Sequence, residues 1–319
     1  MRRTLQEQID ANKRASTIYT FFLILLLTAL GTAIFGAYYP RQWYLGTAGS
    51  FVAALIVAII ARKAGSSILL SLSGAREATA AEDQVLNNVV EEMAIASGLP
   101  KPKIYVIDDA SPNAFATGDS PENAAVAITT GLLAKLDRDE LQGVMAHELS
   151  HIRNYDVRFM TTIAMIAGLI PLLADSFLRM QWWGGGRRRS NNSNDNGLAA
   201  IFMIVGLILS ILAPISAKLL ELAVSRQREF LADASAAEIT RYPEGLARAL
   251  AKIANDPTPM QHANRATQHM YIINPRHLSG EGVSNLFSTH PSTQERIRRL
   301  MQGQDLPVMP PPIQNQFSR

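Results

Sequence analysis

Four long apolar stretches constrain what this chain of 319 residues can fold into; they lie at residues 15–40, 42–61, 159–174 and 197–217. A helix needs about 20 apolar residues to cross the hydrocarbon core of a bilayer. The first, second and fourth stretches meet this requirement. The third spans only if Asp175 and its neighbours lie in the interface, and the alternative is that the third and fourth stretches form a buried helical hairpin against a soluble domain. The pattern predicts a multi-pass membrane protein.

Basic residues flank the first two stretches, and they set the expected orientation; they are Arg2, Arg3, Lys13, Arg14, Arg62 and Lys63. Under the positive-inside rule, the N-terminus is cytoplasmic and the first stretch is an uncleaved anchor. Tyrosines and tryptophans at residues 38–44 and 182–183 then lie at the outer interface, as an aromatic belt does. The predicted location is the cell inner membrane, with both termini in the cytoplasm.

Composition excludes some chemistry. The chain has no cysteine, so disulfides and cysteine-based metal or nucleophile chemistry are ruled out. The net charge of +3 does not indicate a nucleic-acid partner, because many basic residues flank apolar stretches. The expected partners are the lipid bilayer and polypeptide substrates.

Residues 147–151 read His-Glu-Leu-Ser-His. On a helix, His147 and His151 project from one face, one turn apart, so that two imidazoles can hold one metal ion. Glu148 between them reaches the attacking water without binding the metal, which is the arrangement of zinc metalloproteases. The alternative is a polar helix turn with two solvated histidines. A capping-box pattern, Asp137 followed by Glu140, starts the expected helix and favours the metal site.

A catalytic zinc needs a third protein ligand, and the strongest candidates are Glu229 and Asp233. These acids lie four residues apart on an expected helix. One can bind the metal while the other holds the far nitrogen of a ligand histidine. Arg226 and Arg228 would balance the acidic cluster. The alternative is a solvated charged helix face.

Three segments together resemble the HtpX-type membrane metallopeptidases of the M48 family, which also contains the Ste24 prenyl-protein proteases. The segments are PNAFATG with GVMAHELSHIRNYDVR, then SRQREFLADASAAEIT, then STHPSTQERIRRL. The resemblance covers nearly the whole chain. It implies one Zn²⁺ per chain held by His147, His151 and Glu229, catalysis by Glu148, and Asp233 behind a ligand. The implied fold class is mainly α with a small β-sheet: a multi-pass membrane protein with a zincin-like (gluzincin) metalloprotease domain.

The metal site also constrains the topology. His151 precedes the third stretch and Glu229 follows the fourth. Because both side chains must reach one zinc ion, the chain must enter the third stretch and leave the fourth on the same side of the membrane. The Gly-, Arg- and Asn-rich loop at 184–196 then lies on the opposite side and is expected to be flexible. Its three arginines conflict with an exoplasmic position, so either the loop is exoplasmic despite its charge or the hairpin does not fully cross the membrane.

The region between the second and third stretches has soluble-domain patterning. Residues 82–97 predict an amphipathic helix, and 103–107 and 124–129 predict short strands. Residues 112–118 lead into a possible edge strand beside the metal site. Such an edge can pair with an extended substrate backbone, and the resemblance favours this role for Asn113, Ala114, Phe115 and Ala116. The alternative is an ordinary hairpin edge.

After the fourth stretch, helices are expected to about residue 240, from Tyr242 to about 254, and after a capping box at Ser292 and Glu295. In the resembled family, the His-Pro at His290 lies near the zinc, where it could donate to the oxyanion; the alternative is a helix-entry residue. The histidines at 262, 269 and 277 have no ligand spacing, and the tail at 304–319 is expected to be disordered.

The expected domain division has five parts: a transmembrane hairpin at 1–66, a zincin-like subdomain at 67–158, a second hairpin at 159–222, a catalytic helical part at 223–303, and the tail.

The expected function is zinc-dependent endoproteolysis at a cytoplasmic-facing site, and the resemblance implies quality control of misfolded or damaged membrane proteins under stress. Two alternatives are a Ste24-like prenyl-protein protease and a scaffold with a structural zinc. Four stretches argue against the first, because that branch has more spans. An intact Glu148 argues against the second.

Overall fold

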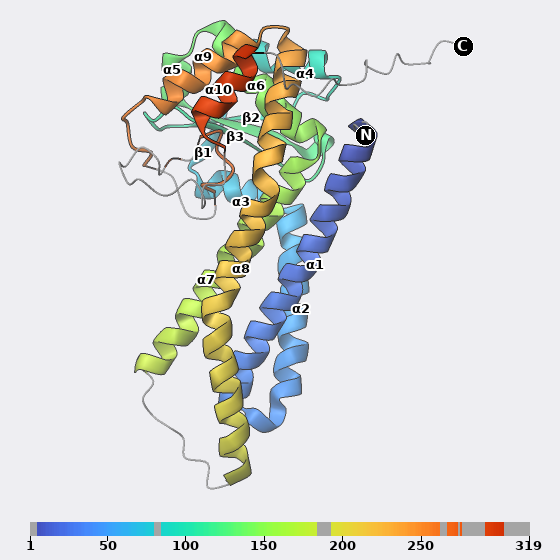
Figure 1. Ribbon diagram of the computed structural model, residues 1–319, viewed down its shortest axis with the longest axis vertical. Helices are drawn as coiled ribbons and strands as arrows, with labels where there is room; N and C mark the ends of the chain where they lie inside the picture. Colours follow the sequence, from blue (N-terminus) through green and yellow to red (C-terminus); the bar gives the residue numbers. More distant parts are fainter. Residues whose placement is uncertain are drawn as a thin grey trace, which may run out of the picture.

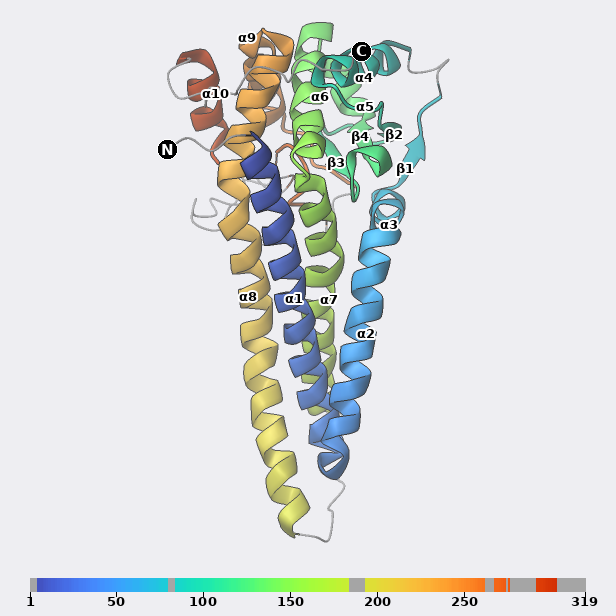
Figure 2. The same ribbon diagram turned by 90° about the vertical axis from the view of Figure 1, so that its right-hand side faces the viewer.

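The computed structural model describes residues 5–79, 84–183, 193–261, 267–273, 275 and 291–302. Within these residues, four long helices form a bundle that leads into a lobe of shorter helices and one sheet (Figures 1 and 2). Most of the loop expected at 184–196 and the whole tail expected at 304–319 lie outside the described residues. Helix α8 begins at Ser193, so the last four residues of that loop are helical.

The bundle consists of α1 (Leu5–Tyr38), α2 (Trp43–Lys63), α7 (Asp156–Trp183) and α8 (Ser193–Thr240), with the short η1 (Pro40–Gln42) between the first two. Each long helix contains a segment apolar and long enough to cross a membrane, including 26 residues of α7. Each also exposes large apolar side chains, such as Phe21, Ile59, Leu172 and Ile204. Exposed apolar surface of this extent fits contact with lipid. The predicted multi-pass fold is therefore confirmed, with four candidate spans.

The lobe contains α3 (Gly65–Leu72), β1 (Ala75–Glu77), α4 (Gln84–Ser97), β2 (Lys103–Ile107), β3 (Ala114–Thr117), η2 (Pro121–Asn123), β4 (Ala125–Thr129), α5 (Thr130–Lys135), α6 (Arg138–Arg153), α9 (Pro243–Ala254) and α10 (Thr293–Gln302). The four strands have the order β1-β2-β4-β3; β2 and β4 run parallel, and the outer pairs are antiparallel. Strand β3 lies at one edge of this sheet. The strands expected at 103–107 and 124–129, and the helix expected at 82–97, agree with these bounds within two residues.

Helix α6 carries the His-Glu-Leu-Ser-His segment, and its start is fixed by a capping box. The Asp137 carboxylate accepts from the Glu140 backbone N–H at 2.9 Å, and the Glu140 carboxylate accepts from the Asp137 N–H at 2.9 Å. Such a cap stabilises a helix by about 1 kcal/mol. The predicted capping box is confirmed, and it sets which residues of α6 share a face.

Helix α6 is almost completely enclosed by α4, α8, α9 and β3, and α9 approaches it closely at two glycines. A Cβ on Gly143 would lie 2.6 Å from the Leu246 nitrogen, and one on Gly245 would lie 2.7 Å from the Asp139 oxygen. A side chain at either position would therefore separate the helices. These neighbours together bury His147, Glu148 and the other residues from Leu141 to Ile152, apart from Gln142.

The corner between α6 and α7 is tight. Tyr155 has φ of 60°, in the left-handed region, which costs a non-glycine residue about 1–2 kcal/mol. Asn154 before it and Asp156 after it are buried. Because of this corner, α7, which contains a candidate span, begins directly after the helix that carries the two histidines.

Candidate metal centre

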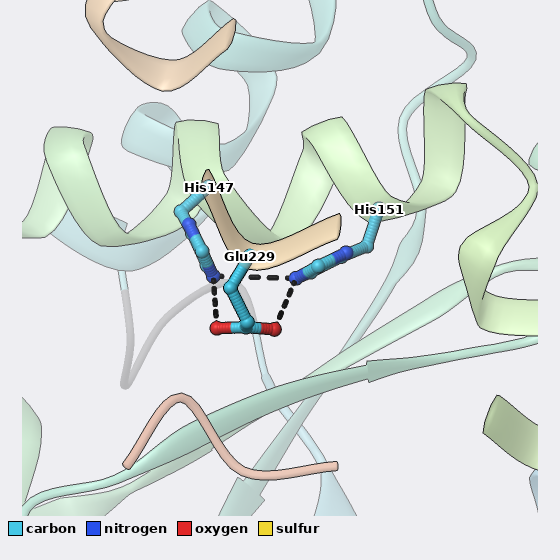
Figure 3. Close-up of side chains that lie close together, drawn as sticks. All are labelled: His147, His151 and Glu229. Carbon is cyan, nitrogen blue, oxygen red and sulfur yellow. Dashed lines mark hydrogen bonds and ion pairs between the residues drawn. The ribbon is translucent and has the colours of Figure 1, made fainter. Parts of the chain in front are cut away.

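Three buried side chains converge at the boundary between the lobe and the bundle (Figure 3). His147 and His151 come from α6, and Glu229 comes from α8. The two histidine Nε2 atoms lie 3.2 Å apart. The Glu229 carboxylate lies 3.7 Å from Nε2 of His147 and 3.4 Å from Nε2 of His151. The structure therefore brings together the three residues that the sequence put forward as ligands.

This donor set fits a zinc ion. Ligands at about 2.0–2.1 Å in tetrahedral geometry lie about 3.3–3.4 Å from one another. The three separations of 3.2, 3.4 and 3.7 Å are close to this spacing. Two imidazoles and one carboxylate are also the donors of known catalytic zinc sites, which leave a fourth position open.

Each histidine is held from behind by a carboxylate. The Asp233 Oδ1 atom lies 3.0 Å from Nδ1 of His147, and the Asp156 Oδ2 atom lies 3.2 Å from Nδ1 of His151. A carboxylate at Nδ1 favours the tautomer with the proton on Nδ1, which leaves the Nε2 lone pair free for a metal. The sequence put forward Asp233 for such a role but did not single out Asp156.

Glu148 lies between the histidines and has 1% of its surface exposed. Neither of its carboxylate oxygens has a side-chain hydrogen-bond partner among the described residues, and the backbone group that acts on it is that of Ala116. Burial raises the pKa of Glu148 to about 7, while His151 acts in the opposite direction and Glu229 adds to the rise. A carboxyl group with this pKa can both accept and release a proton near neutral pH.

The two histidines differ electrostatically. Burial lowers the pKa of His147, although Asp233 partly offsets this. Burial also acts to lower the pKa of His151, but hydrogen bonds to Asp156 and Glu229 outweigh it and raise the pKa to about 10.

Arg296 on α10 is buried against this centre and was not put forward from the sequence. Its Nε and Nη2 atoms donate to both Asp233 oxygens at 2.8 and 2.7 Å. Its Nη1 atom donates to the Ile272 carbonyl at 2.9 Å and lies 3.2 Å from Glu229. Burial alone would raise the pKa of Asp233, but Arg296 and His147 lower it. Arg296 thus neutralises two buried acids.

We expect Arg296→Met to reduce the free energy of unfolding of the metal-free protein by about 3–5 kcal/mol, because removing one partner leaves a buried charge uncompensated. Arg298→Met is the matched control on the same helix, since the Arg298 side chain is 49% exposed and pairs with exposed Glu295. Chemical denaturation in detergent measures both variants. Equal, small effects would show that Arg296 does not compensate these acids.

Strand β3 lies beside this centre, and its outer edge is partly used within the chain. The Ala114 carbonyl accepts from the Ile272 N–H at 2.9 Å, and the Asn113 amide donates to the Ile273 carbonyl at 2.9 Å. The Ala116 backbone lies close enough to Glu148 to lower its pKa slightly. Phe115 is fully buried and packs edge-on against Tyr271, with ring centroids 5.1 Å apart.

Other residues from the sequence interpretation lie elsewhere. His290, His262 and His277 fall outside the described residues. The His269 ring nitrogen lies 3.3 Å from the Met160 carbonyl, away from the three ligands. Arg226 is exposed, whereas Arg228 is buried with its Nη1 atom 3.4 Å from Asp156. Arg228 is therefore buried, but beside Asp156 and not beside Glu229 or Asp233, the acids that it was expected to balance.

Comparisons with known proteins give the family of this chain. Residues 80–303 match the model of peptidase family M48. A protease HtpX homolog of Dictyoglomus thermophilum is 50% identical over 300 residues, covering 93% of this chain and 94% of that protein. A protease HtpX homolog of Caldanaerobacter subterraneus is 47% identical over 304 residues, covering 94% and 98%. The crystal structure of S. mikatae Ste24p is 21% identical with a TM-score of 0.47, and the match covers 90% of this chain and 63% of that one.

The four candidate spans and the His-His-Glu group define a membrane metallopeptidase. The chain belongs to peptidase family M48, and within it to the HtpX-type membrane metalloproteases.

Proposed function

We propose that this protein binds one Zn²⁺ at His147, His151 and Glu229 and cleaves misfolded or damaged membrane proteins at the cytoplasmic face of the inner membrane. The observation that carries the proposal is the place of the site. Its ligands lie on α6, which is followed at once by a candidate span, and on α8, which continues out of another. A site fixed to the ends of two spans acts on chains that are presented at the membrane surface.

Each residue near the centre takes a distinct role. When bound, zinc supplies Lewis-acid chemistry, polarising the scissile carbonyl and making water more acidic. Glu148 accepts the proton of the attacking water and passes it to the leaving amine, which its raised pKa permits. Asp233 fixes the orientation of His147. His290 is retained as a donor to the developing oxyanion.

Substrate is proposed to bind as an added strand along β3, at Asn113, Ala114, Phe115 and Ala116. In an antiparallel ladder, alternate residues direct their backbone groups away from the partner strand. Ala114 does so, but its carbonyl already accepts from Ile272. Ala116 follows the same alternation and is the position proposed to pair with substrate first. Strand addition requires an extended segment. Folded domains lack such a segment, so the proposed site selects unfolded ones.

The orientation and domain division are also proposed. Basic residues at the N-terminus and at Arg62 and Lys63 support a cytoplasmic lobe. The domains are taken as 1–66, 67–158, 159–222, 223–303 and 304–319.

The proposal is tested with single-span reporter proteins in the inner membrane of intact cells. Each reporter carries one small domain, either stable or destabilised by a core substitution, on either the cytoplasmic or the exoplasmic side. We expect cleavage only of the reporter with a destabilised cytoplasmic domain, and none in cells that produce the Glu148→Gln variant.

The other arms separate the parts of the proposal. Equal cleavage of stable and destabilised domains would contradict selection of misfolded proteins. Cleavage on the exoplasmic side would contradict the orientation. If no reporter is cleaved while the purified protein digests casein, membrane proteins are not its substrates.

A further inference from the structure

Asp156 has two separate sets of contacts, one on each carboxylate oxygen. Its Oδ2 atom lies 3.2 Å from Nδ1 of His151. Its Oδ1 atom accepts from the Asn12 side-chain amide at 3.0 Å and lies 3.4 Å from Nη1 of Arg228. Asp156 is fully buried, and Arg228 is nearly so. One buried carboxylate therefore joins a candidate metal ligand to two other helices, α1 and α8.

The contact with α1 extends over the whole corner between α6 and α7. The Asn12 amide also donates to the Asn154 carbonyl at 3.1 Å. The next residue, Lys13, places its ammonium group 4.0 Å from the centroid of the Tyr155 ring. Two adjacent side chains of α1 thus contact Asn154, Tyr155 and Asp156. Tyr155 is the residue with positive φ, so external contacts hold the corner in a conformation that it does not favour alone.

We propose that Asp156 is a positioning residue for His151, and that Asn12 on the first membrane helix supports it, so that the packing of α1 controls how tightly the metal is held. The proposal rests on the zinc assignment above. A carboxylate at Nδ1 fixes the ring direction and tautomer of a ligand histidine. Asn12 fixes the carboxylate in turn, because its amide occupies the oxygen that does not contact His151.

The link also has a functional consequence. Residues 12 and 156 are separated by 144 positions and lie on two different candidate spans. A displacement of α1 relative to α7 would withdraw Asn12 from both of its acceptors. The link therefore couples the metal centre to the packing of α1 against α7.

The alternative is that Asp156 only stabilises the corner, with Arg228 as its charge partner. Zinc affinity separates the two roles, because it can change without any change in folding. Purified protein in detergent is loaded with zinc, and the dissociation constant is measured by competition with a chromogenic chelator. Asp156→Ala is expected to weaken zinc binding about 10- to 100-fold. Asp156→Asn keeps an acceptor oxygen and is expected to have a smaller effect.

Asn12→Ala is expected to weaken zinc binding several-fold without changing KM. If Asn12 acts through Asp156, it should have no further effect in the Asp156→Ala background, which gives a coupled double-mutant cycle. Thr17→Ala is the matched control on α1, since Thr17 is exposed and, among the described residues, its hydroxyl donates only to the Lys13 carbonyl of its own helix. This control is expected to bind zinc like wild type.

Several outcomes would overturn the proposal. One is wild-type zinc affinity in both Asp156 variants. Another is an Asn12→Ala effect that persists in full without Asp156, which would mean that α1 acts by another route. If Asp156→Ala does not fold, the zinc affinities of the Asp156→Asn and Asn12→Ala variants decide, and both must be weaker than the affinity of wild type. If wild type itself binds no zinc, the metal assignment is wrong, and this proposal is overturned with it.

Discussion

Glu148→Gln is expected to reduce kcat for peptide hydrolysis by about 10²–10⁴-fold, because the attacking water loses its base while the metal ligands stay in place. Glutamine has nearly the same shape as glutamate and carries no charge. It removes a buried carboxylate that has no hydrogen-bond partner among the described side chains, so folding should not suffer. Hydrolysis of casein and of an unstructured fluorogenic peptide measures kcat.

The same samples should contain one zinc per chain by elemental analysis. Glu91→Gln on α4 is the control for replacing a glutamate by a glutamine. Glu91 is exposed, and among the described residues its ion-pair partner is Lys101. It should retain wild-type activity. A Glu148→Gln protein that cleaves at a near wild-type rate would rule out Glu148 as the general base. A metal-free variant would instead assign Glu148 a role in binding.

Glu229→Ala is expected to purify largely without metal, whereas Asp233→Asn should keep its zinc with affinity or activity lowered about 10- to 100-fold. Glu229 contacts both Nε2 atoms, so its loss leaves two histidines as the only protein donors. Asp233 contacts Nδ1 of His147 on the far side of the ring. Zinc stoichiometry by elemental analysis and chelator competition distinguish the two positions.

Asparagine is chosen at position 233 because its oxygen can still accept from His147 and Arg296, which keeps α10 in place. Glu244→Ala removes an exposed acid shortly after the end of α8 and serves as the control. It should bind zinc normally. If Asp233→Asn is the metal-free protein and Glu229→Ala stays loaded, the two acids exchange roles.

Much of this protein follows from local sequence rules. The apolar stretches predicted the membrane helices, because only a continuous apolar helix satisfies both the backbone and the bilayer. The pairs His147 with His151 and Glu229 with Asp233 each lie one helical turn apart, so the side chains of each pair share a face once the helix forms. The capping box at Asp137 also follows from a pattern four residues long, and the structure confirms it.

The sequence left open which acid lies beside which histidine nitrogen, because both acids share one face of α8. The packing of α8 against α6 decides this, and it places Glu229 at Nε2 and Asp233 at Nδ1. The sequence also suggested a free edge along β3. In the structure, part of that edge is paired with residues 272 and 273, a contact that no local pattern indicates.

The partners of the metal centre were set by tertiary structure alone. Arg296, Arg298 and Arg299 have the same chemistry on one short helix, and only the docking of α10 buries the first against Asp233, 63 positions earlier. The contacts of Asp156 depend on the left-handed conformation of Tyr155 and on Asn12, which is 144 positions away in the sequence. Local rules fix which side chains share a helix face, whereas long-range packing fixes what that face meets. The candidate ligands were therefore readable from the sequence, whereas most of the charged side chains packed around them were not.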